Sequence, residues 1–145
     1  MKQLYVVEWE RARLVAMGPA MLLLDCGEGT AAAWQKSGLR PWGPDAIAFT
    51  GGRTHHIAGL YGLLTAMTEG GRSTPLRLLH RLDDERIGNL VAAWLQSESC
   101  SFPVSLEADH PGAVLIVGGL RCCSSAKGEG LTWSIEGSGR RVSFG

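Results

Sequence analysis

The chain of 145 residues is 45% hydrophobic, which suits one folded domain with its own core and excludes a disordered chain. Its 14 basic and 14 acidic residues cancel, so it lacks the net positive charge on which nucleic-acid affinity mostly depends. Every apolar run is interrupted before it could span a membrane, and the charged N-terminus lacks the apolar segment of a signal peptide. We therefore expect a single cytoplasmic domain over residues 1–145, with no membrane partner.

The first part of the chain is predicted to form three strands and a helix. The third strand is apolar without alternation, which is typical of a strand buried on both faces. Gly38, preceded by Lys36, suits a helix C-terminus. The predicted strands are QLYVVEW (3–9), RLVAM (13–17) and AMLLLD (20–25), and the predicted helix is TAAAWQKSG (30–38).

The middle of the chain mixes strands and helices. Its last helix begins with acidic residues, which favour the helix dipole, and carries an apolar stripe from Ile87 to Leu95. The expected elements are a strand AIAFT (46–50), a Gly-led turn GGRTHH (51–56), a helix HIAGLYGLLTAMTEG (56–70), a strand PLRLLH (75–80) and a helix DDERIGNLVAAWLQSE (83–98).

Strands dominate the remainder, and the Gly-containing EGSG (136–139) predicts a hairpin turn between the last two. We expect reduced cysteines, because no CxxC spacing occurs. Cys122 and Cys123 are neighbours in a predicted strand, so one should be buried and one exposed; a redox-active or metal-binding pair is the alternative. The predicted strands are FPVSLEA (102–108), AVLIVGG (113–119), LRCCSS (120–125), LTWSIE (131–136) and RRVSFG (140–145).

Four segments together resemble ribonuclease Z, the tRNA 3′-processing endonuclease of the metallo-β-lactamase superfamily. The first of them is close to that family's first motif almost residue for residue. The segments are LLLDCGEGT (22–30), PDAIAFT with HIAGLYGLL (44–64), TPLRLLH (74–80) and GLTWSIEGSGRRVSFG (130–145). The resemblance implies a fold that combines helices and strands, α/β (α+β). It is expected to be the N-terminal half of an αββα sandwich, with a mixed sheet and helices on one face.

The departures from the family fall on its metal-binding loop, which reads Thr-His-x-His-x-Asp-His. The two metal histidines of that pattern correspond to Gly51 and Arg53, and its aspartate corresponds to His55. Only His56 stays in register. The region that corresponds to the next metal histidine, CCSSAKGEG (122–130), contains no histidine. The family's Gly-Asp-Thr motif would come directly after Gly145. A zinc pair needs about three protein ligands per ion, so we expect no metal, no cofactor and no catalytic residue.

The retained polar residues of this region have competing interpretations. His55 and His56 are expected to be a polar pair at a helix start, with His56 against Asp25; the alternative is a residual metal site completed by His80 or His110. The resemblance gives Asp25 a former role in orienting a metal-bound histidine, and we expect it instead to accept hydrogen bonds from the backbone of the Gly51–His56 turn.

Three further interpretations concern other polar groups. Gly51, Gly52 and Arg53 could form an anion-binding turn, the alternative being a tight turn with a solvated arginine. Arg140 and Arg141 are either RNA or acidic-partner contacts or a solvated hairpin end. Ser125, His110 and Asp109 supply the residue types of a hydrolase triad, but no G-x-S-x-G motif accompanies them.

The function indicated is non-catalytic: a degenerate ribonuclease Z-like protein that acts through binding or assembly. The alternative is a tRNA 3′-processing endonuclease whose zinc ligands are completed by a partner chain, and a third interpretation is an inert remnant. An RNA partner has weak support. Because half a sandwich would leave one apolar sheet face uncovered, we expect a homodimer, or a complex with another chain, through that face.

Overall fold

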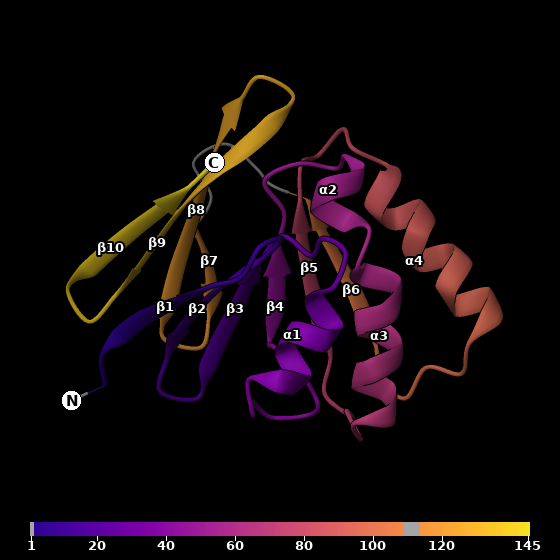
Figure 1. Cartoon of the computed structure of the whole chain (residues 1–145). Helices are drawn as coiled ribbons and strands as arrows, with labels where there is room; N and C mark the ends of the chain where they lie inside the picture. The colour runs from indigo at the N-terminus through magenta and orange to yellow at the C-terminus, as the bar shows by residue number, and fades with distance from the viewer. Residues whose placement is uncertain (1, 109–113) are drawn as a thin grey trace.

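Two β-sheets lie face to face, and the helices lie on the far side of the larger sheet (Figure 1). The computed structural model describes residues 2–108 and 114–145. The larger sheet has the order β1-β2-β3-β4-β5-β6 and consists of Leu4–Glu8 (β1), Arg13–Met17 (β2), Ala20–Leu24 (β3), Ala46–Ala48 (β4), Leu76–His80 (β5) and Val104–Ala108 (β6). The smaller sheet has the order β10-β9-β8-β7 and consists of Val114–Val117 (β7), Leu120–Lys127 (β8), Gly130–Gly137 (β9) and Arg140–Phe144 (β10).

The larger sheet is mixed, as expected. Strands β1 to β3 pair antiparallel through short turns, whereas β3 to β6 pair parallel and are joined through helical connections. The helices are Thr30–Lys36 (α1), Thr54–Ile57 (α2), Leu60–Glu69 (α3) and Arg86–Ser97 (α4). No helix among the described residues is long and apolar enough to cross a membrane.

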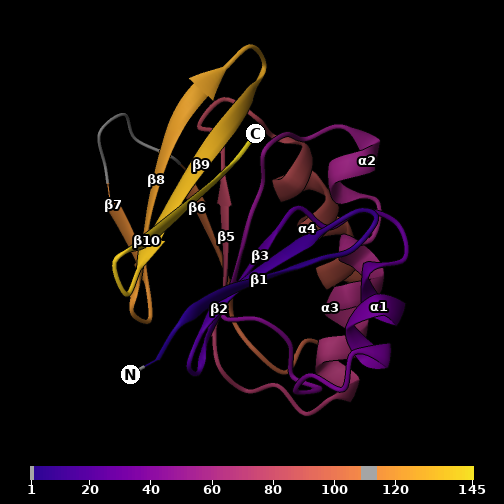
Figure 2. The same ribbon diagram turned by 60° about the vertical axis from the view of Figure 1, so that its left-hand side comes forward.

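Strand β3 is buried on both faces, which confirms the interpretation of its unbroken apolar run. Leu23 faces the helices and belongs to a core with Trp34 of α1 and Trp94 of α4. Leu22 and Leu24 face the smaller sheet. The larger sheet is therefore the central layer of three, as the rotated view shows (Figure 2).

The expectation that one face of the larger sheet would be uncovered is wrong. The C-terminal strands form the smaller sheet and cover that face with apolar side chains, so the chain closes this core itself. Homodimerisation through this face accordingly loses its physical basis. The covering side chains are Val117, Leu120, Cys122, Leu131, Trp133 and Ile135, each at most 2% exposed.

The outer face of the smaller sheet is mainly polar. On β9 the outward residues Thr132, Ser134 and Glu136 alternate with the buried ones. On β8 Cys122 is buried and Cys123 is exposed, as predicted for adjacent strand residues. Hydrophobic exposure on this sheet is concentrated on β7, where Val114 and Ile116 are 42% and 49% exposed. A polar sheet face can stay in water, so this layer needs no further cover.

The predicted helix 56–70 is two helices, α2 and α3. The chain turns at Gly59, whose N–H donates to the carbonyl of Cys26 at 2.9 Å. A Cβ at Gly59 would overlap the carbonyl oxygen of Gly27. The helix is interrupted because its backbone contacts the loop after β3, and only glycine allows this approach.

Arg72 ties together the loops at the end of the sandwich opposite α2. The residue is 2% exposed and its guanidinium lies 5.3 Å from the ring centroid of Phe102. Arg72 has no ion pair with a carboxylate of the described residues, and its charge is solvated by backbone carbonyls. The guanidinium donates to the carbonyl oxygens of Trp42, Pro44, Thr74 and Pro75 at 2.6–2.9 Å.

We predict that Arg72→Met lowers the free energy of unfolding by about 3 kcal/mol or more, because four backbone carbonyls, the buried one of Pro44 among them, lose their donor. Urea denaturation followed by circular dichroism measures the loss. Arg121→Met is the matched control, since Arg121 is exposed on the outer face of the smaller sheet. Its effect should stay below about 0.5 kcal/mol. Similar losses in both variants would contradict the role assigned to Arg72.

Candidate functional site

The polar residues singled out in the sequence meet where the parallel strands end. Asp25 follows β3, the loop from Thr50 to His56 follows β4, and Arg81 follows β5. The carboxyl ends of parallel strands lie at one edge of a sheet, which is where open α/β sheets bind their ligands. The structure thus brings Asp25, Gly51, Arg53, His55 and His56 to one edge.

Asp25 is held by the residue that precedes the loop. Its carboxylate accepts hydrogen bonds from the Thr50 N–H at 2.8 Å and the Thr50 hydroxyl at 2.6 Å. Burial raises the pKa of the Asp25 carboxyl, and the two Thr50 donors and His56 oppose that rise. The expected role as an acceptor is correct, but the donors belong to Thr50 and not to the Gly51–His56 turn.

His56 acts as an internal support of the loop. Its Nδ1 accepts a hydrogen bond from the Arg53 N–H at 3.2 Å, so the neutral ring carries its proton on Nε2. The ring lies so close to Gly51 that a Cβ at that position would overlap it. The imidazoles of His55 and His56 have their centroids 3.9 Å apart, and burial lowers the pKa of His56.

Arg53 is exposed and ion-paired. Its guanidinium donates to the Glu129 carboxylate at 3.1 Å, in the turn between β8 and β9. Gly52 packs against the ion pair of Asp84 and Arg86, and a Cβ there would overlap the Asp84 carboxylate. An anion at the Gly51–Arg53 turn would have to compete with Glu129 for the Arg53 guanidinium. Anion binding at this turn therefore stays a prediction, because its cation is already paired.

The β8–β9 hairpin is fastened to the same loop. The Leu131 N–H donates to the Thr50 carbonyl at 2.8 Å, and the Trp133 indole N–H donates to the Phe49 carbonyl at 2.9 Å. Arg81 reaches the Gly128 carbonyl at 2.6 Å. The smaller sheet therefore lies directly against the end of β4.

The donor set does not fit a metal pair. Both carboxylate oxygens of Asp25 are engaged by Thr50, and the Nδ1 atoms of His56 and His80 contact the Arg53 N–H and the Arg81 carbonyl respectively. Residues 2–108 and 114–145 contain no group of three or more His, Cys, Asp or Glu side chains that could hold an ion. The residual-metal and triad interpretations also involve His110 and Asp109, which lie outside the described residues.

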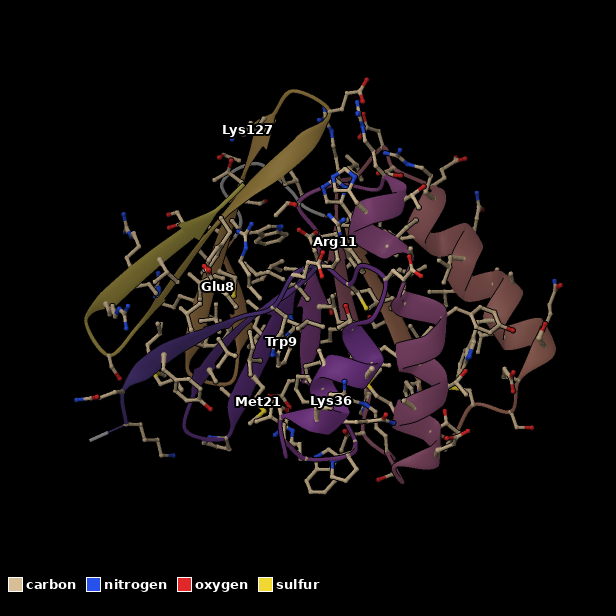
Figure 3. The ribbon with its side chains drawn as sticks, in the orientation of Figure 1. Glu8, Trp9, Arg11, Met21, Lys36 and Lys127 are labelled. Atoms are coloured by element: carbon tan, nitrogen blue, oxygen red, sulfur yellow. The ribbon has the colours of Figure 1, made fainter. Side chains whose placement is uncertain are left out.

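A cavity of about 260 Å³ opens beside Asp25, and it contains residues that the sequence interpretation missed. Trp9 and Arg11 line it from the turn between β1 and β2, and Arg13 from the start of β2; Figure 3 labels Trp9 and Arg11. The sequence signal was present, because WERAR at a hairpin turn concentrates two cations and an aromatic ring. It was overlooked since the resemblance begins only after this hairpin. The remaining lining residues are Glu10, Ala12, Leu24, Asp25, Thr50, His55, His56 and Gly145.

Comparison with curated proteins finds ribonucleases Z. The chain is 35% identical to that of Lachnoclostridium phytofermentans over 79 residues, which are 54% of this chain and 26% of the relative. It is 34% identical to that of Myxococcus xanthus over 95 residues, which are 66% of this chain and 30% of the relative. The matched segments thus span less than a third of these relatives. No protein-family model matches the chain.

Solved structures show the same fold. The human tRNase Z, short form, superposes with a TM-score of 0.70 over 91% of this chain and 60% of its own, at 18% identity. The metallo-beta-lactamase fold protein YhfI from Bacillus subtilis gives 0.69 over 91% and 52%, at 17% identity. The chain has the metallo-β-lactamase fold, as expected, over about half the length of these structures. Its sequence is ribonuclease Z-like, as expected, over the segments that match the curated relatives.

We predict that Thr50→Val destabilises the protein by about 1–3 kcal/mol at pH 7, because one Asp25 oxygen loses its donor. The pKa of Asp25 should rise further, since the lost hydroxyl lowers it. A carboxyl whose pKa is higher in the folded state than in the unfolded state makes the protein less stable as the pH rises. The loss begins near 3.8, the ordinary pKa of the group, and is complete above the folded-state pKa. The difference between variant and wild type should therefore shrink as the pH falls toward about 4.

Urea denaturation between about pH 4 and 8 measures this difference. Thr132→Val is the matched control, because Thr132 lies on the outer face of the smaller sheet between the inward residues Leu131 and Trp133. A Thr50→Val deficit that is the same at every pH would contradict the coupling to Asp25.

Proposed function

We propose that this ribonuclease Z-like chain is a non-catalytic protein that acts through binding. Its fold and the first motif around Asp25 match the relatives, whereas the positions that hold metal in the resembled family carry other chemistry. The hydrolytic activity implied by the relatives' name would require an activated water, and the loop supplies no set of ligands to activate one.

The observation that carries the proposal is the position of the His56 ring. The imidazole fills the space beside Gly51 and uses its Nδ1 for the Arg53 N–H. A ring fixed in this way presents a protonated Nε2, which is not a metal ligand. The single histidine retained in register thus serves the loop's own structure.

Arg53 adds an electrostatic argument. It occupies the position of the second metal histidine of the resembled pattern and brings a guanidinium there in place of an imidazole. A fixed positive charge beside the site opposes the binding of a divalent cation. In the alternative, a partner chain supplies the missing metal ligands of an endonuclease. The metal would then have to bind against this charge and displace His56, and the two predictions that follow distinguish this alternative from the proposal.

The first prediction of this proposal is that the purified protein retains no stoichiometric zinc or manganese after incubation with excess metal and gel filtration. Elemental analysis by mass spectrometry measures the metal content. The matched variant is Gly51→His/Arg53→His/His55→Asp, which carries the family's His-x-His-x-Asp-His pattern through His56. It should retain measurably more zinc than the wild type. One or more ions held per wild-type chain would overturn the proposal.

The second prediction is that the protein does not cleave pre-tRNA at the 3′ trailer, with zinc or manganese added, because it lacks an activated water. A gel assay with end-labelled pre-tRNA measures cleavage, and human tRNase Z, short form, is the positive control. Cleavage that co-elutes with the protein and falls in His56→Ala would contradict the proposal. It would favour the metal-dependent alternative instead.

A further inference from the structure

Two guanidinium groups in the cavity beside Asp25 make no hydrogen bond or close ion pair with the described residues, and Arg13 has only a longer-range attraction to the Asp25 carboxylate. Of the eleven arginines, eight donate to a carboxylate or a backbone carbonyl in the described structure. The exceptions are Arg11, Arg13 and Arg121, which have no carboxylate or carbonyl partner among the described residues. Arg11 and Arg13 line the same cavity, whereas Arg121 lies on the outer face of the smaller sheet. Unpaired guanidinium groups that share a cavity favour an anionic ligand.

Both arginines are held by ordered backbone. The turn that carries Arg11 is closed by a hydrogen bond from the Trp9 N–H to the Ala12 carbonyl at 2.9 Å. The Arg11 carbonyl accepts from the Gly27 N–H at 3.0 Å, which fixes the turn to the loop after β3. Arg13 begins β2, and its guanidinium lies 5.1 Å from the ring centroid of Phe144. The backbone that carries both arginines is thus fixed against the loop after β3, and the Arg13 side chain is also held by Phe144.

The other charged groups of the cavity leave room for an anion. The Asp25 carboxylate has both oxygens engaged by Thr50, and Glu10 is exposed at the mouth. His55 and His56 add imidazole groups that can donate hydrogen bonds. Gly145 also lines the cavity. A ligand oxygen therefore meets two guanidinium forks and a pair of imidazoles.

We propose that this cavity binds a phosphomonoester of nucleotide size, either a free mononucleotide or the phosphorylated end of an RNA. A dianionic phosphate offers several oxygens to two guanidinium forks. The volume of about 260 Å³ suits a phosphate with its sugar. The inference rests on the proposed binding function, since it assigns the ligand of that site without a metal ion.

The test is a titration of metal-free protein in EDTA, followed by tryptophan fluorescence and calorimetry. The probes are AMP, adenosine as the phosphate-free control, and a short oligoribonucleotide with either a 3′-phosphate or a 3′-hydroxyl. We expect saturable binding of the phosphorylated probes only. Tighter binding of AMP identifies the free nucleotide as the source, and tighter binding of the 3′-phosphorylated oligonucleotide identifies an RNA end.

Variants assign the binding to the two arginines. Arg11→Gln/Arg13→Gln should weaken binding about tenfold or more, because both charged donors are lost. Arg121→Gln removes the same charge from the third unpaired arginine and should change the affinity less than about twofold. Arg11→Gln alone, at an exposed position, keeps the test valid if the Arg13 substitution impairs folding, and it should still weaken binding several-fold.

Two results would overturn the inference. One is the absence of saturable binding of AMP and of the 3′-phosphorylated oligonucleotide at about 1 mM. The other is an Arg11→Gln/Arg13→Gln variant that is folded and binds as tightly as Arg121→Gln. Neither result affects the non-catalytic proposal, which fails separately if the protein cleaves pre-tRNA when zinc is added.

Discussion

The junction at Thr50 is the interaction on which the rest of the site depends. Its N–H and hydroxyl hold the Asp25 carboxylate after β3, and its carbonyl accepts the Leu131 N–H of β9. One residue thereby joins two strands of the larger sheet to the smaller sheet. A buried carboxylate is tolerable only when donors satisfy it, so the loop after β4 must keep this course whatever chemistry it carries.

This constraint explains how a loop can retain its form while its residues change. The backbone is positioned by Thr50 before the loop and by Gly59 after it, where the chain contacts the Cys26–Gly27 segment. Between these points His56 supports the turn, and Arg53 pairs with Glu129 across to the β8–β9 hairpin. Contacts within the chain thus engage the polar groups of this loop, whereas Arg11 and Arg13 make no hydrogen bond to a carboxylate or carbonyl of the described residues.

Sequence-based predictions were accurate where a structure depends on residues that are close together in the chain. The apolar run of β3 and the hairpin turn before β10 follow from periodicity and turn residues, and the structure confirms them. The apolar stripe of α4 is confirmed at Ile87, Val91 and Trp94, whereas Leu95 is 48% exposed. It failed where two distant segments meet. The helix 56–70 was divided because Gly59 touches the loop after β3, and the smaller sheet was not recognised as a cover, although Leu131, Trp133 and Ile135 alternate with polar neighbours.

The sequence by itself indicated most of the elements, the family resemblance and the presence of Gly51 and Arg53 where the resembled pattern has histidines, because each depends on residue identity and spacing along the chain. Only the tertiary structure decided which groups are already engaged: that Thr50 satisfies Asp25, that His56 fills the space at Gly51, and that the C-terminal strands close the core. These facts depend on contacts between residues far apart in the chain, and periodicity carries no information about which of several surfaces a segment will cover.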